Sequence, residues 1–380
     1  MVRATKVETY DALVVGGGSA GIGVAIALKD AGVERMAVLD RHRVGASFEA
    51  WPAETRLITP SFPTNSIGML DLNSVAIGVS PGYSLETEHP TGRQYAAHLR
   101  GVAKHFELPV ITETNVLRVT KIDDTFVVDT DEQTLRAKHV VWAAGEFQYP
   151  RTGGFVGSEL CLHTANIERY DELEGESFVV IGGGESGIDA AYYLSLHGHE
   201  VTVLDKGEAW ESKSSDPSLG PSTYSRVRMR QPRFQEHVAM VPWAGVSKVE
   251  RVGDASEGEG FSVFTEDGRW FGTDVRPILA GGFAGGHRLV ADLFERRDDG
   301  FPLLSDRDES TIVPGLFLCG PGVRHGDQVF CFIYKYRQRF AVVAKAIADS
   351  LGLPAERLEL YRNWGMYLDD LSCCGEECVC

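Results

Sequence analysis

The feature that most constrains the fold is a glycine-rich turn that occurs twice, each time between an apolar run and a helical pattern. Residues 10–15 (YDALVV) precede the first turn, GGGSAG at residues 16–21, and residues 22–32 follow it with apolar side chains at helical spacing. The same order recurs over residues 177–198, around the turn GGGESG at residues 182–187. Each unit predicts a strand, a tight turn and a helix, which together open a βαβ fold.

The similarity between the two halves extends past the turns, which indicates an internal repeat. Residues 116–145 read as strand, acidic turn, strand, turn and a final apolar strand into Ala-Ala-Gly. Residues 246–282 repeat this pattern with a longer loop rich in Gly, Glu and Ser. We therefore predict an α/β protein with two Rossmann-like domains, doubly wound and three-layered, each carrying a β-meander.

The first turn has the spacing Gly16-x-Gly18-x-x-Gly21. Glycines at these positions permit the tight turn, let the backbone approach a pyrophosphate and allow close packing of helix on strand. The helix that follows offers its first amide hydrogens to the anion. Asp40 ends the next predicted strand, where a carboxylate accepts hydrogen bonds from ribose hydroxyls. The context therefore predicts an adenine-dinucleotide site.

The second turn, Gly182-x-Gly184-x-x-Gly187, predicts a second dinucleotide site by the same reasoning, with Asp205 as its ribose carboxylate. Asp205 favours NADH, because it would repel a 2′-phosphate, whereas the adjacent Lys206 softens that preference and leaves NADPH open. Two such sites in one chain indicate one cofactor that stays bound and one that visits.

Charge and composition exclude several other functions. The net charge of −17 argues against general affinity for nucleic acid or anionic membranes. No apolar run has the length of a membrane-spanning helix, and residues 1–10 lack the apolar core of a signal peptide. The seven cysteines are too few for a secreted disulfide framework. We therefore expect a cytoplasmic protein, with a homo-oligomer as an open possibility.

The ordered segments VVGGGSAGIG, VLD, VVWAAG, VVIGGGESGID, VTVLD and PGLFLCG resemble the flavoproteins with two dinucleotide-binding domains, the pyridine nucleotide-disulfide oxidoreductases. The resemblance covers nearly the whole chain. It implies FAD in the first site, NAD(P)H in the second, and hydride transfer from nicotinamide to flavin. It also implies an FAD-binding domain in two parts, residues 1–172 and 284–362, around an NAD(P)H-binding domain at residues 173–283, with a C-terminal segment at residues 363–380.

The turns and the resemblance together imply a set of candidate cofactor-binding residues. They are Gly16, Gly18, Ser19, Ala20, Gly21, Asp40, Arg41, Trp51, Thr59, Pro60, Ser61, Val116, Ala144, Gly145, Gly182, Gly184, Glu185, Ser186, Gly187, Asp205, Lys206, Gly282, Gly320, Pro321, Gln328 and Val329.

The resemblance also implies where the flavin ring would lie. We expect a helix over residues 328–350 whose start directs positive dipole at the pyrimidine, and a further short helix over residues 364–371. Trp51 and residues 59–61 are candidates for apolar walls of the flavin, although Trp51 equally suits packing of a loop onto the core. The surrounding segment, residues 45–100, has little regular pattern and is expected to be a lid or binding loop.

Two segments, TRLITPSFPTNSIGMLDLN and SPGYSLETEHPTG, are similar to the bacillithiol disulfide reductase and flavin monooxygenase-like group. The position that matches that group's cysteine in the first glycine turn is Ala20. The monooxygenase fingerprint FxGxxxH is matched in part by Phe155, Gly157 and the later His163. The resemblance to this group therefore leaves reduction of a disulfide and monooxygenation both open.

The isolated histidines and cysteines have two interpretations each. His163 and His325 are the histidines expected nearest the cofactors, where they would suit acid–base work, but a lone histidine is more often structural. Cys319 and Cys331 lie in apolar surroundings and are interpreted as buried structural thiols.

Four cysteines crowd the end of the chain, in the sequence CCGEECVC, and are the candidate catalytic residues: Cys373, Cys374, Cys378 and Cys380. They could pass electrons by thiol–disulfide exchange, or bind a soft cation, while their spacing gives only weak support for zinc. The neighbouring glutamates raise thiol pKa values and so oppose fast exchange.

The leading hypothesis is an FAD-dependent NAD(P)H oxidoreductase that passes electrons from the flavin to a disulfide or other thiol-linked acceptor. One alternative is a flavin-dependent monooxygenase that acts on a soft nucleophile. Another is a soft-metal-binding or redox-sensing flavoprotein with little turnover.

Overall fold

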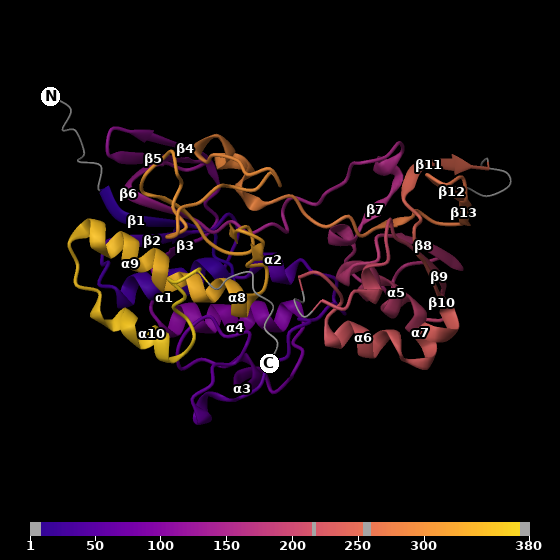
Figure 1. Ribbon diagram of the computed structural model, residues 1–380, viewed down its shortest axis with the longest axis horizontal. Helices are drawn as coiled ribbons and strands as arrows, with labels where there is room; N and C mark the ends of the chain where they lie inside the picture. Colours follow the sequence, from indigo (N-terminus) through magenta and orange to yellow (C-terminus); the bar gives the residue numbers. More distant parts are fainter. Residues whose placement is uncertain (1–8, 215–217, 254–259, 373–380) are drawn as a thin grey trace. The chain divides into compact units, whose positions relative to one another are not determined.

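The computed structural model describes residues 9–214, 218–253 and 260–372, and it divides into two compact units (Figure 1). Within these described ranges, unit 1 comprises residues 9–49, 60–148 and 285–372, and unit 2 comprises residues 50–59 and 149–284. Among the described residues, no helix combines the length and the apolar character needed to cross a lipid bilayer.

Unit 1 is built on a seven-stranded sheet of mixed direction. Its spatial order is β3 (Val110–Ile111), β2 (Met36–Leu39), β1 (Thr9–Val15), β6 (Thr134–Trp142), β5 (Thr125–Thr130) and β4 (Val116–Ile122), with β15 (Leu316–Leu318) paired to β6. Strands β3, β2, β1, β6 and β15 run parallel, whereas β4, β5 and β6 form an antiparallel meander. Strand β2 is buried throughout, as expected for a parallel strand covered on both faces.

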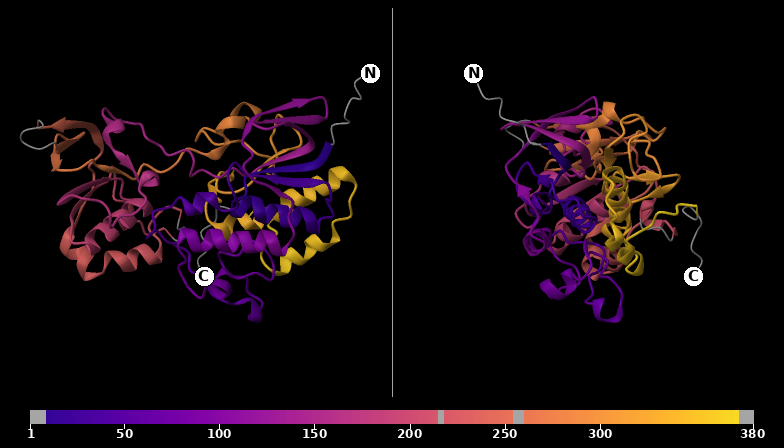
Figure 2. Two further views of the ribbon diagram at one scale, coloured as in Figure 1. Left: turned by 180° about the vertical axis from the view of Figure 1, so that it is seen from behind. Right: turned by 90° about the vertical axis from the view of Figure 1, so that its left-hand side faces the viewer.

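The helices α1 (Ser19–Asp30), α4 (Gly92–His105) and α9 (Phe340–Leu351) lie together on one side of this sheet (Figures 1 and 2). Helix α1 is buried from Ser19 to Leu28, because it packs between the sheet and α9. A side chain at Gly23 would collide with the ring of Phe340, so glycine is what permits this close approach. The shorter elements of unit 1 are α2 (Ala46–Glu49), η1 (Asn65–Ile67), α3 (Pro81–Leu85), η5 (Gly286–Leu293), β16 (Arg324–His325), β17 (Gln328–Val329), α8 (Ile333–Tyr336), η6 (Arg337–Arg339), η7 (Glu356–Leu358) and α10 (Glu359–Asn363).

Unit 2 repeats the architecture on a smaller scale. A five-stranded parallel sheet has the order β10 (Val238–Val241), β9 (Glu200–Leu204), β8 (Ser177–Ile181), β14 (Ile278–Leu279) and β7 (Leu162–His163). One core joins this sheet to α5 (Glu185–Leu196) and α7 (Pro232–His237), and another joins it to the meander of β11 (Val246–Val252), β12 (Gly260–Thr265) and β13 (Trp270–Thr273). Unit 2 also contains α6 (Thr223–Met229), η2 (Ser158–Leu160), η3 (Thr164–Asn166) and η4 (Ala209–Glu211). The predicted α/β fold with two repeated, meander-bearing units is confirmed.

Three local expectations differ from the structure. The predicted helix over residues 328–350 begins later, at Ile333, because Gln328 and Val329 pair with residues 324–325 in a β-hairpin. The short helix expected over residues 364–371 is not present, because the nearest helix, α10, ends at Asn363. The segment at residues 149–172, assigned by sequence to the first domain, lies in unit 2, where β7 pairs with β14.

Residues 60–85, part of the expected lid or binding loop, are organised around a buried carboxylate. Asp71 Oδ2 accepts hydrogen bonds from Ser80 Oγ and the Gly82 amide, both at 2.8 Å, and Oδ1 accepts from the Asn73 amide at 3.0 Å. The guanidinium of Arg337 donates to the Asp71 carbonyl oxygen. These contacts satisfy the buried polar atoms of residues 60–85, which is why a stretch without regular pattern adopts one structure.

His98 is buried beside this segment, where Ser84 Oγ lies 2.7 Å from its Nδ1 and the ring stacks on Tyr95. Burial disfavours the charged imidazolium and lowers the pKa of His98 from 6.5 to about 4. Because the imidazole of His98 binds a proton more tightly in the unfolded chain, the folded protein is most stable above pH 6.5 with respect to this group. Its free energy of unfolding decreases as the pH falls from 6.5 towards 4.

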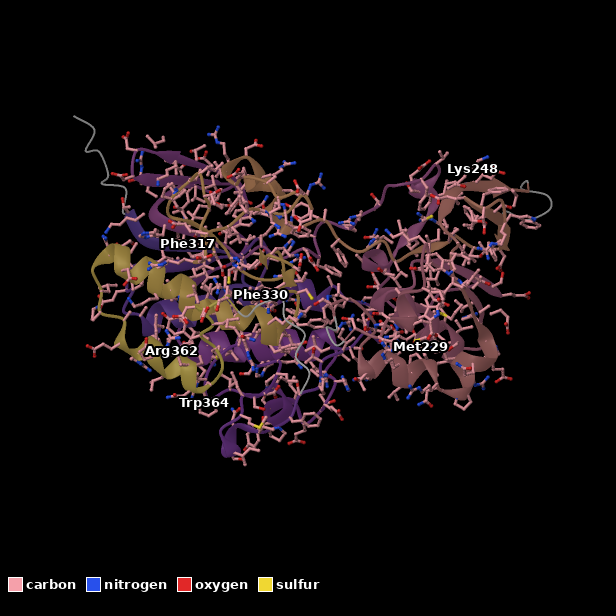
Figure 3. All side chains as sticks on the ribbon, viewed as in Figure 1. Met229, Lys248, Phe317, Phe330, Arg362 and Trp364 are labelled. Atoms are coloured by element: carbon pink, nitrogen blue, oxygen red, sulfur yellow. The ribbon has the colours of Figure 1, made fainter. Side chains whose placement is uncertain are left out.

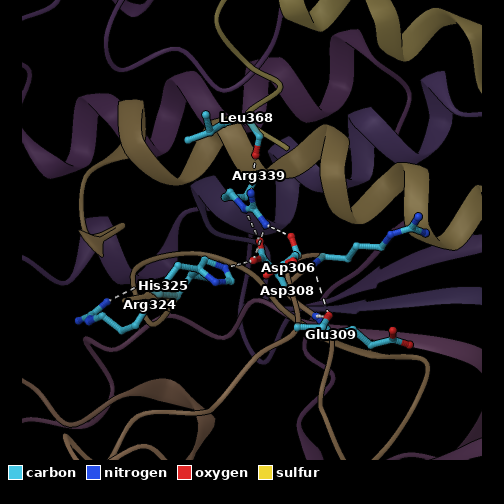
Figure 4. A network of polar contacts seen from close by, with 10 residues as sticks. Asp306, Asp308, Glu309, Arg324, His325, Arg339 and Leu368 are labelled. Carbon is cyan, nitrogen blue, oxygen red and sulfur yellow. Dashed lines mark hydrogen bonds and ion pairs between the residues drawn. The ribbon is translucent and has the colours of Figure 1, made fainter. Parts of the chain in front are cut away.

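A single ion-pair network joins four segments of unit 1 (Figure 4). Asp308 and Arg339 are 0% exposed, and two guanidinium nitrogens of Arg339 donate to the two carboxylate oxygens at 2.9 Å. His325 Nε2 lies 2.6 Å from Asp308 Oδ1, and Arg339 also donates to the carbonyl oxygens of Asp306 and Leu368. The ring centroid of Phe330, which is labelled in Figure 3, lies 5.9 Å from the guanidinium carbon of Arg339. The network therefore fixes the C-terminal segment and the 324–329 hairpin to the start of α9.

Changing Asp308 to Asn should destabilise the protein by about 3–5 kcal/mol, because it leaves the buried guanidinium of Arg339 without its counter-charge. Asp306→Asn is the matched control, since that side chain is exposed and should change stability by less than about 0.5 kcal/mol. Urea unfolding of the two variants measures the difference. Equal stability of the two would show that the network contributes no net stabilisation.

The pH dependence of stability should change when His98 is replaced by Gln. Between pH 7 and pH 5 the parent protein should lose about 2 kcal/mol more unfolding free energy than His98→Gln, because only the parent must keep a buried imidazole neutral. Urea unfolding at the two pH values measures this difference. A parent and a variant with the same pH dependence would contradict the assignment.

Candidate functional site

The first glycine turn connects β1 to α1 through contacts that only glycine allows. Gly16 has φ of +113°, and a Cβ there would lie 2.3 Å from the carbonyl oxygen of Ala143. A Cβ on Gly21 would lie 1.7 Å from the carbonyl oxygen of Gly16. At Gly18, by contrast, an added Cβ meets nothing within 4 Å. The outer two glycines are therefore required by packing, while the middle one leaves the turn open to an approaching group.

Asp40 organises this turn through its carboxylate. Oδ2 accepts the Gly17 amide at 2.6 Å, and Oδ1 accepts the His42 amide at 2.8 Å. Asp40 is half-buried, and each carboxylate oxygen can accept a further hydrogen bond, so its pairing with the backbone is compatible with ribose hydroxyls. Arg41, the next residue, is exposed.

The second turn reproduces this geometry in unit 2. Gly182 has φ of +109°, and a Cβ on Gly187 would lie 1.8 Å from the carbonyl oxygen of Gly182. The middle glycine, Gly184, again has open space where a Cβ would stand. Asp205 Oδ2 accepts the Gly183 amide at 2.8 Å, as Asp40 does with Gly17. The neighbouring Lys206 is exposed.

One contact of the second turn was missed by sequence reasoning. A Cβ on Gly183 would lie 2.5 Å from the ring of Trp210, which is buried against the turn. No local signal marks Trp210, because it belongs to η4, after the strand that Asp205 terminates.

Both turns fit the pyrophosphate of an adenine dinucleotide. Each turn presents an open middle glycine at the start of a helix of twelve residues, α1 or α5. Each also carries a carboxylate at the end of the following strand. Backbone amides at a helix start favour an anion, and the absence of a side chain at the middle glycine lets that anion come close.

Several residues predicted to bind FAD gather at the carboxyl edge of the sheet in unit 1. The Ala143 amide donates to Val15 at the end of β1, and the Cys319 amide donates to Trp142 at the end of β6. A Cβ on Gly320 would lie 3.0 Å from Cβ of Ala20. The first turn therefore lies beside the segments that contain Ala144, Gly145, Gly320 and Pro321, as expected for adjacent parallel strands.

The turn after Gly320 is shaped by Arg324, which sequence reasoning did not identify. Arg324 donates to the carbonyl oxygens of Pro321 at 2.6 Å and Val323 at 2.9 Å, and its guanidinium lies 4.2 Å from the Phe301 ring centroid. Burial lowers the pKa of Arg324 from its usual value. The Arg-His dipeptide gave no sign of this role, because no spacing rule marks a guanidinium that bonds the carbonyl oxygens just before it, and the ring of Phe301 comes from another segment.

Two polar side chains that were predicted to bind a cofactor form hydrogen bonds within the protein. Ser19 shares a hydrogen bond of 2.6 Å with Tyr336 in the interior of unit 1. Glu185 accepts hydrogen bonds from Ser222 and Ser225 at the start of α6. These contacts hold α8 to α1 and α6 to α5, respectively.

The remaining predicted residues are distributed among several places. Trp51 and Thr59 lie in unit 2, whereas Pro60 and Ser61 lie in unit 1, and Ser61 Oγ accepts a hydrogen bond from Asn73. Gln328 does not start a helix, so the expected helix dipole is absent there, and its Oε1 is buried without a hydrogen-bond partner. Val116 begins β4, Val329 lies in β17, and Ser186 lies in the first turn of α5.

His163 has a structural role in unit 2. Its Nδ1 accepts the Ala165 amide at 3.0 Å, so Nε2 carries the proton and donates to the carbonyl oxygen of Gly282 at 3.1 Å. Burial lowers the pKa of His163, which keeps the ring neutral. The contact ties β7 to the loop after β14, where the candidate Gly282 lies.

The described cysteines are Cys161, Cys319 and Cys331, and none of the three forms a disulfide bond. Burial raises the pKa of Cys161 to about 12 and raises that of Cys319 well above its ordinary value, so both remain protonated and unreactive. The candidate catalytic residues Cys373, Cys374, Cys378 and Cys380 lie outside the described residues. Within the described ranges, no group of three or more His, Cys, Asp or Glu side chains is arranged to hold a metal ion.

Comparison with known proteins identifies related sequences and folds. The family model for pyridine nucleotide-disulphide oxidoreductases matches residues 13–320. The oxidoreductase CzcO of Bacillus velezensis is 29% identical over 203 residues, 51% of this chain and 54% of that protein. The bacilliredoxin reductase Bdr of Bacillus subtilis is 28% identical over 218 residues, 57% of this chain and 63% of that protein. The chain thus spans little more than half the length of the curated relatives it matches.

Solved structures show the same fold. The bacillithiol disulfide reductase Bdr from Staphylococcus aureus aligns with a TM-score of 0.72 and 21% identity, over 90% of this chain and 99% of that one. A flavin-containing monooxygenase from Stenotrophomonas maltophilia aligns with a TM-score of 0.68 and 19% identity, over 90% and 99%. Together with the family match over most of the sequence, these likenesses confirm the resemblance: the chain belongs to the pyridine nucleotide-disulphide oxidoreductase family of oxidoreductase enzymes.

Proposed function

We propose that the chain binds FAD in unit 1 and NADH or NADPH in unit 2, and passes electrons from the nucleotide through the flavin to a disulfide or other thiol-linked acceptor. The tail cysteines 373, 374, 378 and 380 take part in the last step. When bound, the two cofactors supply the electron transfer, and the protein binds and orients them.

The observation that carries this proposal is the duplicated turn. Both turns have an open middle glycine, and both use an aspartate to accept the amide that precedes that glycine, at 2.6 Å from Asp40 and 2.8 Å from Asp205. A glycine turn kept only for packing would need no open position there. The duplication of open position and carboxylate supports two dinucleotide sites.

Residues around the first turn would hold FAD. Amides at the start of α1 would bind the pyrophosphate, Asp40 the ribose, and the segments at residues 143–145 and 319–321 would border the rest of the cofactor. In unit 2 the start of α5 and Asp205 would hold the nicotinamide nucleotide in the same manner. The exposed Lys206 beside Asp205 leaves both NADH and NADPH as donors.

The thiol-linked acceptor is supported by how the C-terminal segment is fixed. The Leu368 amide donates to the carbonyl oxygen of Gln338 at 2.9 Å, and the Leu368 carbonyl oxygen accepts from Arg339. Asp369 pairs with Arg362 at 2.6 and 2.7 Å. Asp308 pairs with Arg339 through its side chain, and its backbone carbonyl oxygen accepts the Leu318 amide. Leu318 directly precedes Cys319 and the turn at Gly320. Leu368 and Asp369 are thus fixed to unit 1 a few positions before Cys373 in the sequence, and Arg339 links Leu368 to Asp308.

A second candidate function is monooxygenation of a soft nucleophile. It is favoured by the residues at the flavin edge of unit 1, where position 20 is alanine and Cys319 is a buried, protonated thiol. Neither position 20 nor Cys319 thus offers a reactive thiol at that edge. The two functions differ in whether the tail cysteines are needed.

Replacing the middle glycine of each turn by valine, one turn at a time, should show which cofactor each turn binds. Gly18 and Gly184 have φ of −79° and open space at Cβ, so the variants should fold, but the added side chain would block a pyrophosphate. Gly18→Val should be purified without flavin. Gly184→Val should keep flavin and lose reduction by NADH or NADPH by at least 100-fold in anaerobic stopped-flow measurements. A yellow Gly18→Val protein, or normal reduction of Gly184→Val, would overturn the assignment of that site.

Replacing all four tail cysteines by serine should separate the two functions. Flavin reduction by the nucleotide should stay within 2-fold of the parent, because both turns are intact, while turnover with a disulfide acceptor should fall by at least 10-fold. Both rates are measured in the same stopped-flow series, followed by mixing with O2. Unchanged disulfide turnover rejects the tail relay. A long-lived oxygenated flavin spectrum in both proteins supports monooxygenation instead.

A further inference from the structure

A ten-residue segment leaves unit 1 and packs as part of unit 2. Ala50–Thr59, here called the strap, groups with unit 2, while the residues on either side, Glu49 and Pro60, group with unit 1. The chain therefore enters and leaves unit 2 once before the main body of that unit begins at residue 149. Contacts within unit 2 explain why the strap belongs there.

Three consecutive strap residues make these contacts. The Ala53 amide donates to the carbonyl oxygen of Glu168 at 2.8 Å. The carboxylate of Glu54 accepts the amides of Tyr170 and Asp171 at 3.1 to 3.2 Å. These bonds fix one side of the strap to the 168–171 turn.

The third contact joins the strap to the helix that follows the second glycine turn. Thr55 Oγ1 donates to Oδ2 of Asp189 at 2.6 Å. Asp189 lies on α5 and is 6% exposed, and its other oxygen accepts from Arg228 of α6, which is 3% exposed. The guanidinium of Arg228 lies 4.3 Å from the ring centroid of Tyr224.

The buried pair continues to the glycine turn itself. Arg228 Nη2 donates to Ser225 Oγ at 3.0 Å, and that hydroxyl donates to Oε2 of Glu185 at 2.6 Å. Glu185 is the first residue of α5 and stands inside the turn Gly184-Glu185-Ser186-Gly187. A continuous chain of hydrogen bonds therefore runs from Thr55 through Asp189, Arg228 and Ser225 to Glu185.

This chain of hydrogen bonds links the strap to the negatively charged Glu185 carboxylate at the second turn. A nucleotide pyrophosphate at the start of α5 would stand near the Glu185 carboxylate, so its binding favours the state in which that carboxylate is held by α6. Asp189 forms the ion pair with Arg228 that holds α6 against α5. The Nε atom of Arg228 is buried and has no hydrogen-bond partner. The second oxygen of Asp189 is held by the strap.

We propose that the strap closes on unit 2 when the nicotinamide nucleotide binds, and that Thr55, Asp189 and Arg228 are positioning residues for that nucleotide. The proposal rests on the proposed function, because it takes the second glycine turn as the nucleotide site. Coupling between two equilibria is reciprocal, so bound nucleotide tightens the strap, and loss of the Thr55 bond weakens nucleotide binding by the same factor.

The test uses the oxidised holoenzyme with NAD+ and NADP+, which bind without turnover. Thr55→Val removes the hydroxyl at nearly constant shape, and Thr55→Ser retains it. Thr223→Val, the same change at an exposed residue of α6, is the matched control. Calorimetric titration measures nucleotide affinity, and amide hydrogen exchange of peptides covering residues 50–59 and 168–172 measures strap closure.

We expect saturating nucleotide to slow exchange in both peptides by at least 5-fold in the parent, Thr55→Ser and Thr223→Val. In Thr55→Val the slowing should be lost and the dissociation constant should rise 3- to 10-fold. Nucleotide that binds the parent without slowing exchange, or binds Thr55→Val as tightly as the parent, rejects the strap alone. Failure of both nucleotides to bind the parent rejects the proposed function together with the strap.

Discussion

The contact between the first and third glycine of each turn is the constraint on which both units depend. A Cβ on Gly21 or Gly187 would lie 1.7 or 1.8 Å from the carbonyl oxygen of Gly16 or Gly182, so each helix can rise this close to its strand only with glycine at that position. That packing points the first amides of α1 and α5 and the open middle glycine towards the carboxyl edge of the sheet. The strand ends that carry Asp40, residues 143–145 and Gly320 meet at the same edge of unit 1, as parallel pairing requires.

Elements encoded by local pattern could be predicted from the sequence. The two turns, the helices after them, the meanders and the aspartates at the ends of β2 and β9 follow from spacing within about 30 residues, and all appear in the structure. The α/β class follows from their order. Each turn must begin with glycine, because an L side chain at Gly16 or Gly182 would meet backbone atoms in a left-handed conformation.

Features that depend on distant partners could not be predicted. The helix expected from Gln328 starts later because residues 324–329 pair as a hairpin, held by His325 on Asp308 and by buried Arg339. An apolar run with helical spacing gives no sign of that ion pair. In the same way, Glu185 suggested a cofactor contact, but its partners, Ser222 and Ser225, lie in another helix. The strap joins unit 2 through Thr55 and Asp189, which are separated by 134 positions.

If the two turns are the two cofactor sites, as proposed, each chain binds two different adenine dinucleotides at the same time. Equilibrium dialysis of the flavin-reconstituted protein against NAD+ and NADP+, followed by quantitation of every bound nucleotide, tests this directly. One FAD and one nicotinamide nucleotide per chain, with the FAD retained as the second site saturates, is the predicted result. A total of one dinucleotide per chain, with the nicotinamide nucleotide displacing FAD, would contradict the account.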